Sequence, residues 1–212
     1  MAEWFEPGSP VRSWRAWLQL VVGLAGFGVA VSLMVRSGLG LGPWDAFHAG
    51  LANRTGISIG AASIIAGVLI VAGSWFIGVR PGVGTLANML LIGLFIDLTL
   101  PVMPQAANWL VGGVMYVVAI LVCGLSTGFY MAPGLGKGPR DGLIVGLCRR
   151  TGRSIRLVRT LVELSALGLG WGMGGPVGVG TLLFTFGIGP AMQWGMRVCG
   201  VETARTPSTA EA

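Results

Sequence analysis

Residues Gly38–Asp45 read GLGLGPWD, and residues Gly134–Asp141 read GLGKGPRD. The two stretches lie 96 residues apart, and the same offset continues downstream without a gap. Gly82–Leu86 and Gly178–Leu182, for example, both read GVGTL. Chance does not easily produce several matches at one spacing. The sequence therefore predicts two related halves that share one arrangement of helices and breaks.

The composition around these motifs places both halves in a membrane. Hydrophobic residues make up 53% of the 212 residues and charged residues only 10%, with 37 glycines. A soluble protein carries about 25% charged residues and about 7% glycine. Six apolar segments are long enough, or nearly so, to cross a hydrocarbon core of about 30 Å. They are roughly 17–34, 58–77, 85–100, 108–131, 154–173 and 181–198.

We therefore expect an all-α integral membrane protein surrounded by the lipid bilayer. Residues 17–100 form a first three-span repeat and residues 108–198 a second. An odd number of spans in each half turns the second half upside down relative to the first, so the repeat is expected to be inverted. The first apolar segment is kept as a span, because it is too long for a signal-peptide core and no small-residue cleavage site follows it.

Positive charges predict the orientation. Arginine and lysine gather at cytoplasmic ends of spans. Two such residues fall on one side of the expected topology, Arg36 and Arg54. Twelve fall on the other: Arg12, Arg15, Arg80, Lys137, Arg140, Arg149, Arg150, Arg153, Arg156, Arg159, Arg197 and Arg205. Both tails, residues 1–16 and 199–212, are therefore expected in the cytoplasm.

Each half also contains a segment that is too long for a tight loop and too short to cross. These segments are Pro43–Asn53 and Pro139–Arg150. Each follows glycines, begins at proline, carries an aspartate two positions later and ends at Thr-Gly, which predicts a short helix of about 16 Å. Two alternatives remain open. The segments are either re-entrant half-helices that point at the bilayer midplane or amphipathic connectors that lie flat in the interface.

A re-entrant pair would form a substrate site between the two helix starts. Asp45 and Asp141 would lie in the first turns, where a carboxylate interacts with free N–H groups and the positive end of the helix dipole. His48, three residues after Asp45, can share a proton or hydrogen bond with it, or serve as an interfacial residue. The candidate substrate-binding residues of this region are Asp45, His48, Gly136, Gly138, Arg140 and Asp141.

Four further residues are candidates outside the half-helices. Thr85 and Thr181 of the GVGTL motifs either cap helices in packed turns or offer hydroxyl groups to a ligand. Arg159 and Glu163 lie four residues apart within the fifth span, where ionisable residues are costly. They form either a site for a proton, a cation or an anionic substrate, or an internal structural pair.

Several classes of protein are excluded or disfavoured. The net charge of +6 comes from 13 arginines and one lysine without a basic patch interleaved with aromatics, so we expect no nucleic-acid partner. The three cysteines are scattered, and no nucleophile–base pair, metal-ligand cluster or phosphate loop emerges. We therefore expect no enzyme activity, no metal site and no cofactor.

The repeated motifs, together with Gly174–Leu182, which reads GGPVGVGTL, resemble those of the bacterial YczE/YitT group of small multi-pass membrane proteins. The resemblance covers about residues 17–198. It implies a location in the bacterial inner membrane but carries no established activity or site.

Function must therefore be inferred from the architecture. The first hypothesis is a transporter or channel-like facilitator of a small molecule or ion, with its site between the half-helices and Glu163. The alternative is a non-transporting membrane partner, either a substrate-capturing subunit of a multi-part importer or an accessory protein of a neighbouring enzyme. Glycines four apart, as at Gly124 and Gly128, favour close packing inside the bundle over a homodimer, which stays possible.

Overall fold

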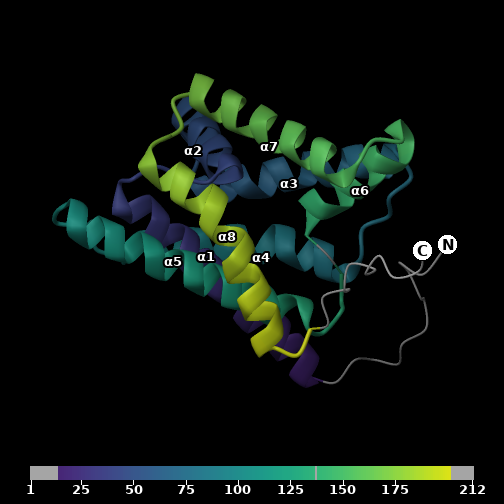
Figure 1. The fold of residues 1–212 in the computed structure, drawn as a ribbon, viewed down its shortest axis with the longest axis horizontal. Coiled ribbons are helices and arrows are strands. Elements are labelled where there is room, and N and C mark those ends of the chain that lie inside the picture. Colours follow the sequence, from purple (N-terminus) through teal and green to yellow (C-terminus); the bar gives the residue numbers. More distant parts are fainter. Residues whose placement is uncertain (1–13, 137, 202–212) are drawn as a thin grey trace, which may run out of the picture.

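The computed structural model describes residues 14–136 and 138–201, and every regular element in these ranges is an α-helix (Figure 1). The helices are α1 (Trp14–Ser37), α2 (Pro43–Thr55), α3 (Ile59–Phe76), α4 (Val83–Thr99), α5 (Trp109–Met131), α6 (Pro139–Thr151), α7 (Ile155–Gly172) and α8 (Val179–Val198). The expected all-α fold is confirmed for this part of the chain. The ends of the two tails, residues 1–13 and 202–212, lie outside the described residues.

The helix boundaries repeat along the chain as the motifs do. The first residues of α6, α7 and α8 each lie 96 positions after those of α2, α3 and α4. The short helices α2 and α6 both have 13 residues, which is slightly longer than predicted. In each, a terminal threonine hydroxyl, of Thr55 or Thr151, donates 2.7 Å to the carbonyl four residues earlier. The next residue, Gly56 or Gly152, then ends the helix at a φ of 75° or 67°.

Three of the described helices are long and apolar enough to cross a membrane, namely α1, α3 and α5, and α4 is a shorter apolar helix. Helix α7 differs because it carries Arg156, Arg159 and Glu163. Helix α8 is long enough but less apolar, because its second half contains Gln193 and Arg197. The structure thus gives a helical membrane protein with three clear span candidates.

Glycines allow the central helices to approach closely. A Cβ atom at Gly124 or Gly128 of α5 would clash with the carbonyl of Ala191 or Gly195 in α8. Helix α1 packs on α5 on one side and on α4 on the other. The Gly124 and Gly128 spacing therefore serves packing within this chain, as the sequence favoured.

The two halves differ in how their last two helices pack. Helices α3 and α4 pack together, with a Cβ at Gly60 of α3 clashing with the carbonyl of Gly93 in α4. The α4 residue Asp97 also holds the start of α3. It accepts hydrogen bonds from the Gly60 N–H at 2.9 Å and from the Ser58 hydroxyl at 2.5 Å.

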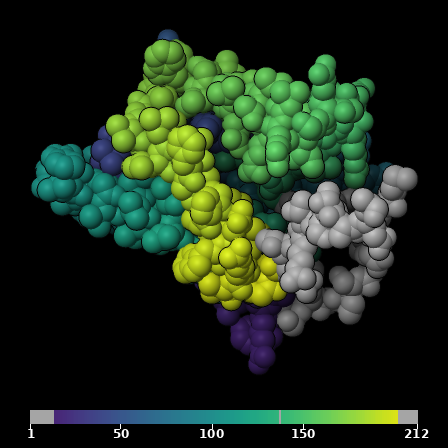
Figure 2. All heavy atoms as spheres, viewed as in Figure 1, coloured from purple at the N-terminus to yellow at the C-terminus, as the bar shows by residue number. Residues whose placement is uncertain are grey.

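Helices α7 and α8 make at most slight contact in the described chain. The positions equivalent to Gly60 and Asp97 are Arg156 and Gln193. A long charged side chain thus replaces the glycine that admits α4, and a neutral amide replaces the carboxylate that holds α3. The surface is hollowed between α7 and α8 (Figure 2), so this side of the bundle is open.

Candidate functional site

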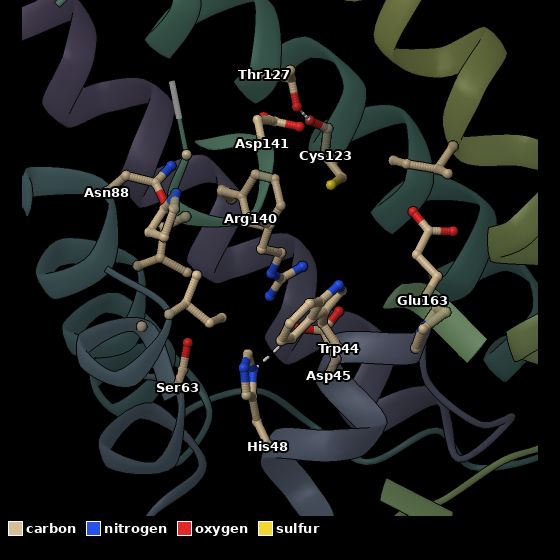
Figure 3. A pocket seen from close by; sticks show the side chains of 18 of the residues that line it. Trp44, Asp45, His48, Ser63, Asn88, Cys123, Thr127, Arg140, Asp141 and Glu163 are labelled. Carbon is tan, nitrogen blue, oxygen red and sulfur yellow. Dashed lines mark hydrogen bonds and ion pairs between the residues drawn. The ribbon is translucent and has the colours of Figure 1, made fainter. Parts of the chain in front are cut away.

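A cavity of about 170 Å³ lies where the N-termini of α2 and α6 meet (Figure 3). All eight described helices contribute to its wall. An apolar cavity of about 150 Å³ can hold a benzene-sized molecule. The space is therefore large enough for a small organic solute.

Equivalent positions of the two halves face this cavity together. The pairs include Phe27 and Cys123, Trp44 and Arg140, Asp45 and Asp141, Ser63 and Arg159, Asn88 and Phe184, and Ile92 and Ile188. The repeat thus supplies matching backbone on both sides, while most of the paired side chains differ. The cavity has an approximately symmetric frame and an asymmetric chemistry.

Arg140 stands at the second position of α6 and reaches over Trp44, at the second position of α2. The guanidinium carbon lies 4.9 Å from the centre of the indole ring, and Figure 3 shows the two groups facing each other. A cation stacked on an aromatic face keeps the N–H groups at its edge available. Within the described residues the Arg140 guanidinium donates no hydrogen bond, so its donors remain free for another molecule.

Asp45 and His48 lie beside this stack, one turn apart on α2. Their exposed fractions are only 5% and 2%. His48 Nδ1 lies 3.8 Å from an Asp45 carboxylate oxygen, which is too long for a hydrogen bond. This nitrogen has no hydrogen-bond partner among the described residues. Buried polar atoms are normally satisfied, so this position calls for a ligand or a water molecule.

Arg159 and Glu163 reach the same cavity from α7. Arg159 Nε donates to a Glu163 carboxylate oxygen at 3.0 Å, and their side chains are 50% and 36% exposed. Both residues lie on the side where α7 and α8 stand apart. The pair therefore borders the open side of the cavity and is not sealed inside the bundle.

Seven of the ten predicted site residues line this cavity: Asp45, His48, Gly138, Arg140, Asp141, Arg159 and Glu163. The other three, Gly136, Thr85 and Thr181, are not among its lining residues. The Thr181 hydroxyl donates to the Leu41 carbonyl at 2.7 Å and accepts from the Gly178 N–H at 3.1 Å. Thr181 thus holds backbone in place.

These three residues belong to a reciprocal contact between the halves. The glycine-rich lead before α2 docks on the start of α8, where the Gly180 N–H donates to the Leu39 carbonyl at 2.7 Å. The lead before α6 docks on the start of α4, where the Gly84 N–H donates to the Leu135 carbonyl at 2.9 Å. Gly136 lies against Thr85 in this second contact. Each half therefore positions the half-helix of the other.

Sequence reasoning did not place Trp44, Ser63 or Asn88 in the site. Trp44 fitted a re-entrant and an interfacial helix equally well. The repeat held the missing signal, because it aligns Trp44 with Arg140 and Ser63 with Arg159. Across residues 14–136 and 138–201, no three His, Cys, Asp or Glu side chains are grouped as metal ligands would be.

Comparisons with known proteins give the family. Residues 14–197 match a family described as "Family of unknown function (DUF6198)". The chain is 38% identical over 174 residues to the "Uncharacterized membrane protein YczE" of Bacillus subtilis (strain 168), covering 82% of this chain and 80% of that protein. It is 35% identical over 179 residues to an "Uncharacterized protein" of Haemophilus influenzae, covering 84% and 82%. It is also 29% identical over 166 residues to the "Uncharacterized protein YyaS" of Bacillus subtilis, covering 76% and 83%.

No solved structure matches the chain. The match over residues 14–197 and the two relatives above 30% identity agree with the membrane character of the helices. The chain therefore belongs to this family of YczE-like membrane proteins.

Proposed function

We propose that the protein is a transporter or channel-like facilitator that moves a small solute through the cavity between α2 and α6. The observation that carries the proposal is the group formed by Arg140, Asp45 and His48 inside an apolar helical bundle. Ionisable groups at such depth are costly, and in membrane proteins they commonly mark a substrate or ion pathway. No catalysed reaction forms part of the proposal.

The proposed topology has six spans in two inverted halves, with both termini in the cytoplasm and the protein in the bacterial inner membrane. The charge bias and the repeated helix boundaries support it. We further propose that α2 and α6 are re-entrant. Pro43, Asp45 and His48 are buried by other parts of the chain, which favours entry into the bundle over a helix lying flat on its surface.

The open side supports solute movement over simple storage of a ligand. A bound molecule needs a route in and out, and the gap between α7 and α8 reaches the cavity at Arg159 and Glu163. The equivalent route between α3 and α4 is closed by their packing. A binding site open on one side and closed on the other is what a protein with alternating access presents in one of its states.

The test is uptake by purified protein in liposomes that contain no other protein. The panel consists of an amino acid, a monocarboxylate, an amine and a sugar, each radiolabelled. We expect one class to accumulate or equilibrate faster than in empty liposomes, and Asp45→Asn, Asp141→Ala and Glu163→Gln to slow it.

The matched control is Arg80→Gln, which removes an exposed charge between α3 and α4 and should leave uptake unchanged. Each variant is first checked for an unchanged elution volume and melting temperature. Binding without uptake, or copurification with an ATPase that is needed for uptake, would overturn this proposal in favour of a non-transporting partner.

A further inference from the structure

The charged side chains that line the cavity differ in whether they form a hydrogen-bonded ion pair. Arg159 and Glu163 neutralise each other at 3.0 Å. Asp45 and Asp141 each lie in the first turn of a short helix, close to the positive end of its dipole. Arg140 forms no direct ion pair with a carboxylate of the described residues, although Asp45 and Asp141 line the same cavity and are near enough to act on its charge. The wall thus presents a cation and a carboxylate that are not bonded to each other.

Arg140 is arranged to bind a carboxylate. Its guanidinium carbon lies over the Trp44 ring at 4.9 Å, which holds the group in place, and its N–H groups donate no hydrogen bond within the described residues. A guanidinium edge with parallel N–H donors matches the two oxygens of a carboxylate. The start of α2 adds the positive end of a helix dipole next to this position.

Asp45 and His48 are arranged to bind a cationic donor. Asp45 is only 5% exposed, and the neighbouring His48 Nδ1 is buried without a hydrogen-bond partner. The two acceptors are 3.8 Å apart. An ammonium group has three N–H donors and can reach two acceptors at this separation. It would neutralise Asp45 and satisfy the orphaned nitrogen, provided that the ring proton of His48 is on Nε2.

The rest of the wall combines polar side chains, namely Ser63, Asn88, Thr127, Tyr130 and Thr185, with an apolar part that suits an apolar body. Phe27, Ile92, Ile144 and Ile188 line the cavity with no polar side-chain group of their own. A solute that carries only an anion would leave Asp45 unneutralised, and one that carries only a cation would face Arg140. We infer that the solute is a small zwitterion with an apolar side chain, such as an aliphatic α-amino acid, held by its carboxylate on Arg140 and by its ammonium on Asp45 and His48.

This inference rests on the proposed function only in assuming that the cavity binds the solute that is moved. It can be tested by binding alone, with three molecules that share one apolar body. Leucine carries both charged groups, isoamylamine lacks the carboxylate and 4-methylpentanoate lacks the ammonium. Binding to the purified full-length protein is measured by calorimetry or by quenching of tryptophan fluorescence. We expect leucine to bind at least about tenfold more tightly than either analogue, since each loses charge-assisted hydrogen bonds.

The variants should exchange these preferences in a defined way. Arg140→Gln should weaken the binding of leucine at least about tenfold. The binding of isoamylamine should stay unchanged or become tighter, because only a carboxylate loses its partner. Arg140→Lys should bind leucine little better than Arg140→Gln does, since a lysine cannot provide the paired planar donors. Asp45→Asn should weaken the binding of leucine and of isoamylamine but not the binding of 4-methylpentanoate. Retained binding of one analogue shows in each case that the variant is folded, and Arg80→Gln serves as the control that alters none of the three.

Equal binding of 4-methylpentanoate and leucine would overturn the inference in favour of a simple carboxylate. Equal binding of isoamylamine and leucine would overturn it in favour of an amine. The two proposals also fail separately. Leucine binding without leucine uptake in liposomes would leave the ligand class intact and overturn transport. Uptake of another solute without leucine binding would leave transport intact and overturn the zwitterion inference.

Discussion

Trp44 and Arg140 occupy the same position in two copies of one motif, yet their side chains differ in chemistry. The glycines, prolines and aspartates around them are retained in both copies, because the same backbone path is needed twice. The position itself carries a flat aromatic surface in one copy and a planar cation in the other, and the two stack. Divergence at this one position creates a cation–aromatic pair that neither copy of the motif would have alone.

A glycine in the lead before α2 provides a prediction at this scale. Gly40 has a φ of +102°, and a Cβ there would lie 2.5 Å from the Gly178 nitrogen. Gly40→Ala should therefore destabilise the protein by about 2 kcal/mol or more, because both the backbone conformation and the contact resist a side chain. The measurement is the melting temperature in detergent.

The control is Gly113→Ala in α5, where a Cβ would meet no atom within 4 Å. This change should leave the melting temperature unchanged or raise it slightly, since alanine favours a helix over glycine. Equal losses in the two variants would show that the lead before α2 is not a tight contact.

Individual residues were predictable to different degrees. Asp45, Asp141 and Arg140 could be placed in the site because their positions beside Gly-Pro fix them in the first turn of a helix. Thr181 was a reasonable ligand candidate, but its hydroxyl group bonds Leu41 across the halves. A sequence shows that a hydroxyl group is present, whereas its partner depends on which distant backbone passes beside it.

At the scale of elements, the difference between the two helix pairs matters most. The sequence predicted every helix that the structure describes, since apolar length, proline starts and glycine stops are local signals. It did not predict that α3 and α4 pack while α7 and α8 stand apart. That outcome depends on tertiary contacts such as Gly60 with Gly93, whose importance a local pattern does not reveal.

The gap between α7 and α8 should contain water, because Arg159 and Glu163 border it and charged groups require hydration. Thr185 lines the cavity from α8, whereas the adjacent Phe186 does not and is 77% exposed. A cysteine introduced by Thr185→Cys should react with a charged methanethiosulfonate reagent much faster than one introduced by Phe186→Cys, which is expected to face lipid.

The comparison uses a background in which Cys123, Cys148 and Cys199 are replaced by alanine. Leucine added in excess should slow the reaction at position 185 and not at position 186. Slow reaction at both positions would mean that the gap is dry and is no route to the cavity.

For the whole molecule, the prediction concerns which side of the membrane each half-helix faces. Arg54 and Arg150 are equivalent, exposed residues near the ends of α2 and α6. In an inverted repeat they lie on opposite sides. In intact cells an impermeant maleimide should label Arg54→Cys, whereas Arg150→Cys should be labelled only after the membrane is permeabilised.

The same cysteine-free background applies, and Arg80→Cys should behave like Arg150→Cys because both are expected in the cytoplasm. Labelling of positions 54 and 150 from one side would contradict the inverted arrangement. The two half-helices would then enter from the same face, and the charge bias would need another explanation.

The reciprocal docking of the two glycine-rich leads has a consequence for how such a chain can change over generations. Leu39 is held by α8 and Leu135 by α4, so each half completes the other. A substitution at the start of α8 or α4 should therefore shift the lead, and with it the half-helix, of the other half. Substitutions in the two halves are therefore expected to be coupled. Cavity side chains can change in one half alone. Loss of the glycines of either lead, in contrast, would disturb the contact with the other half.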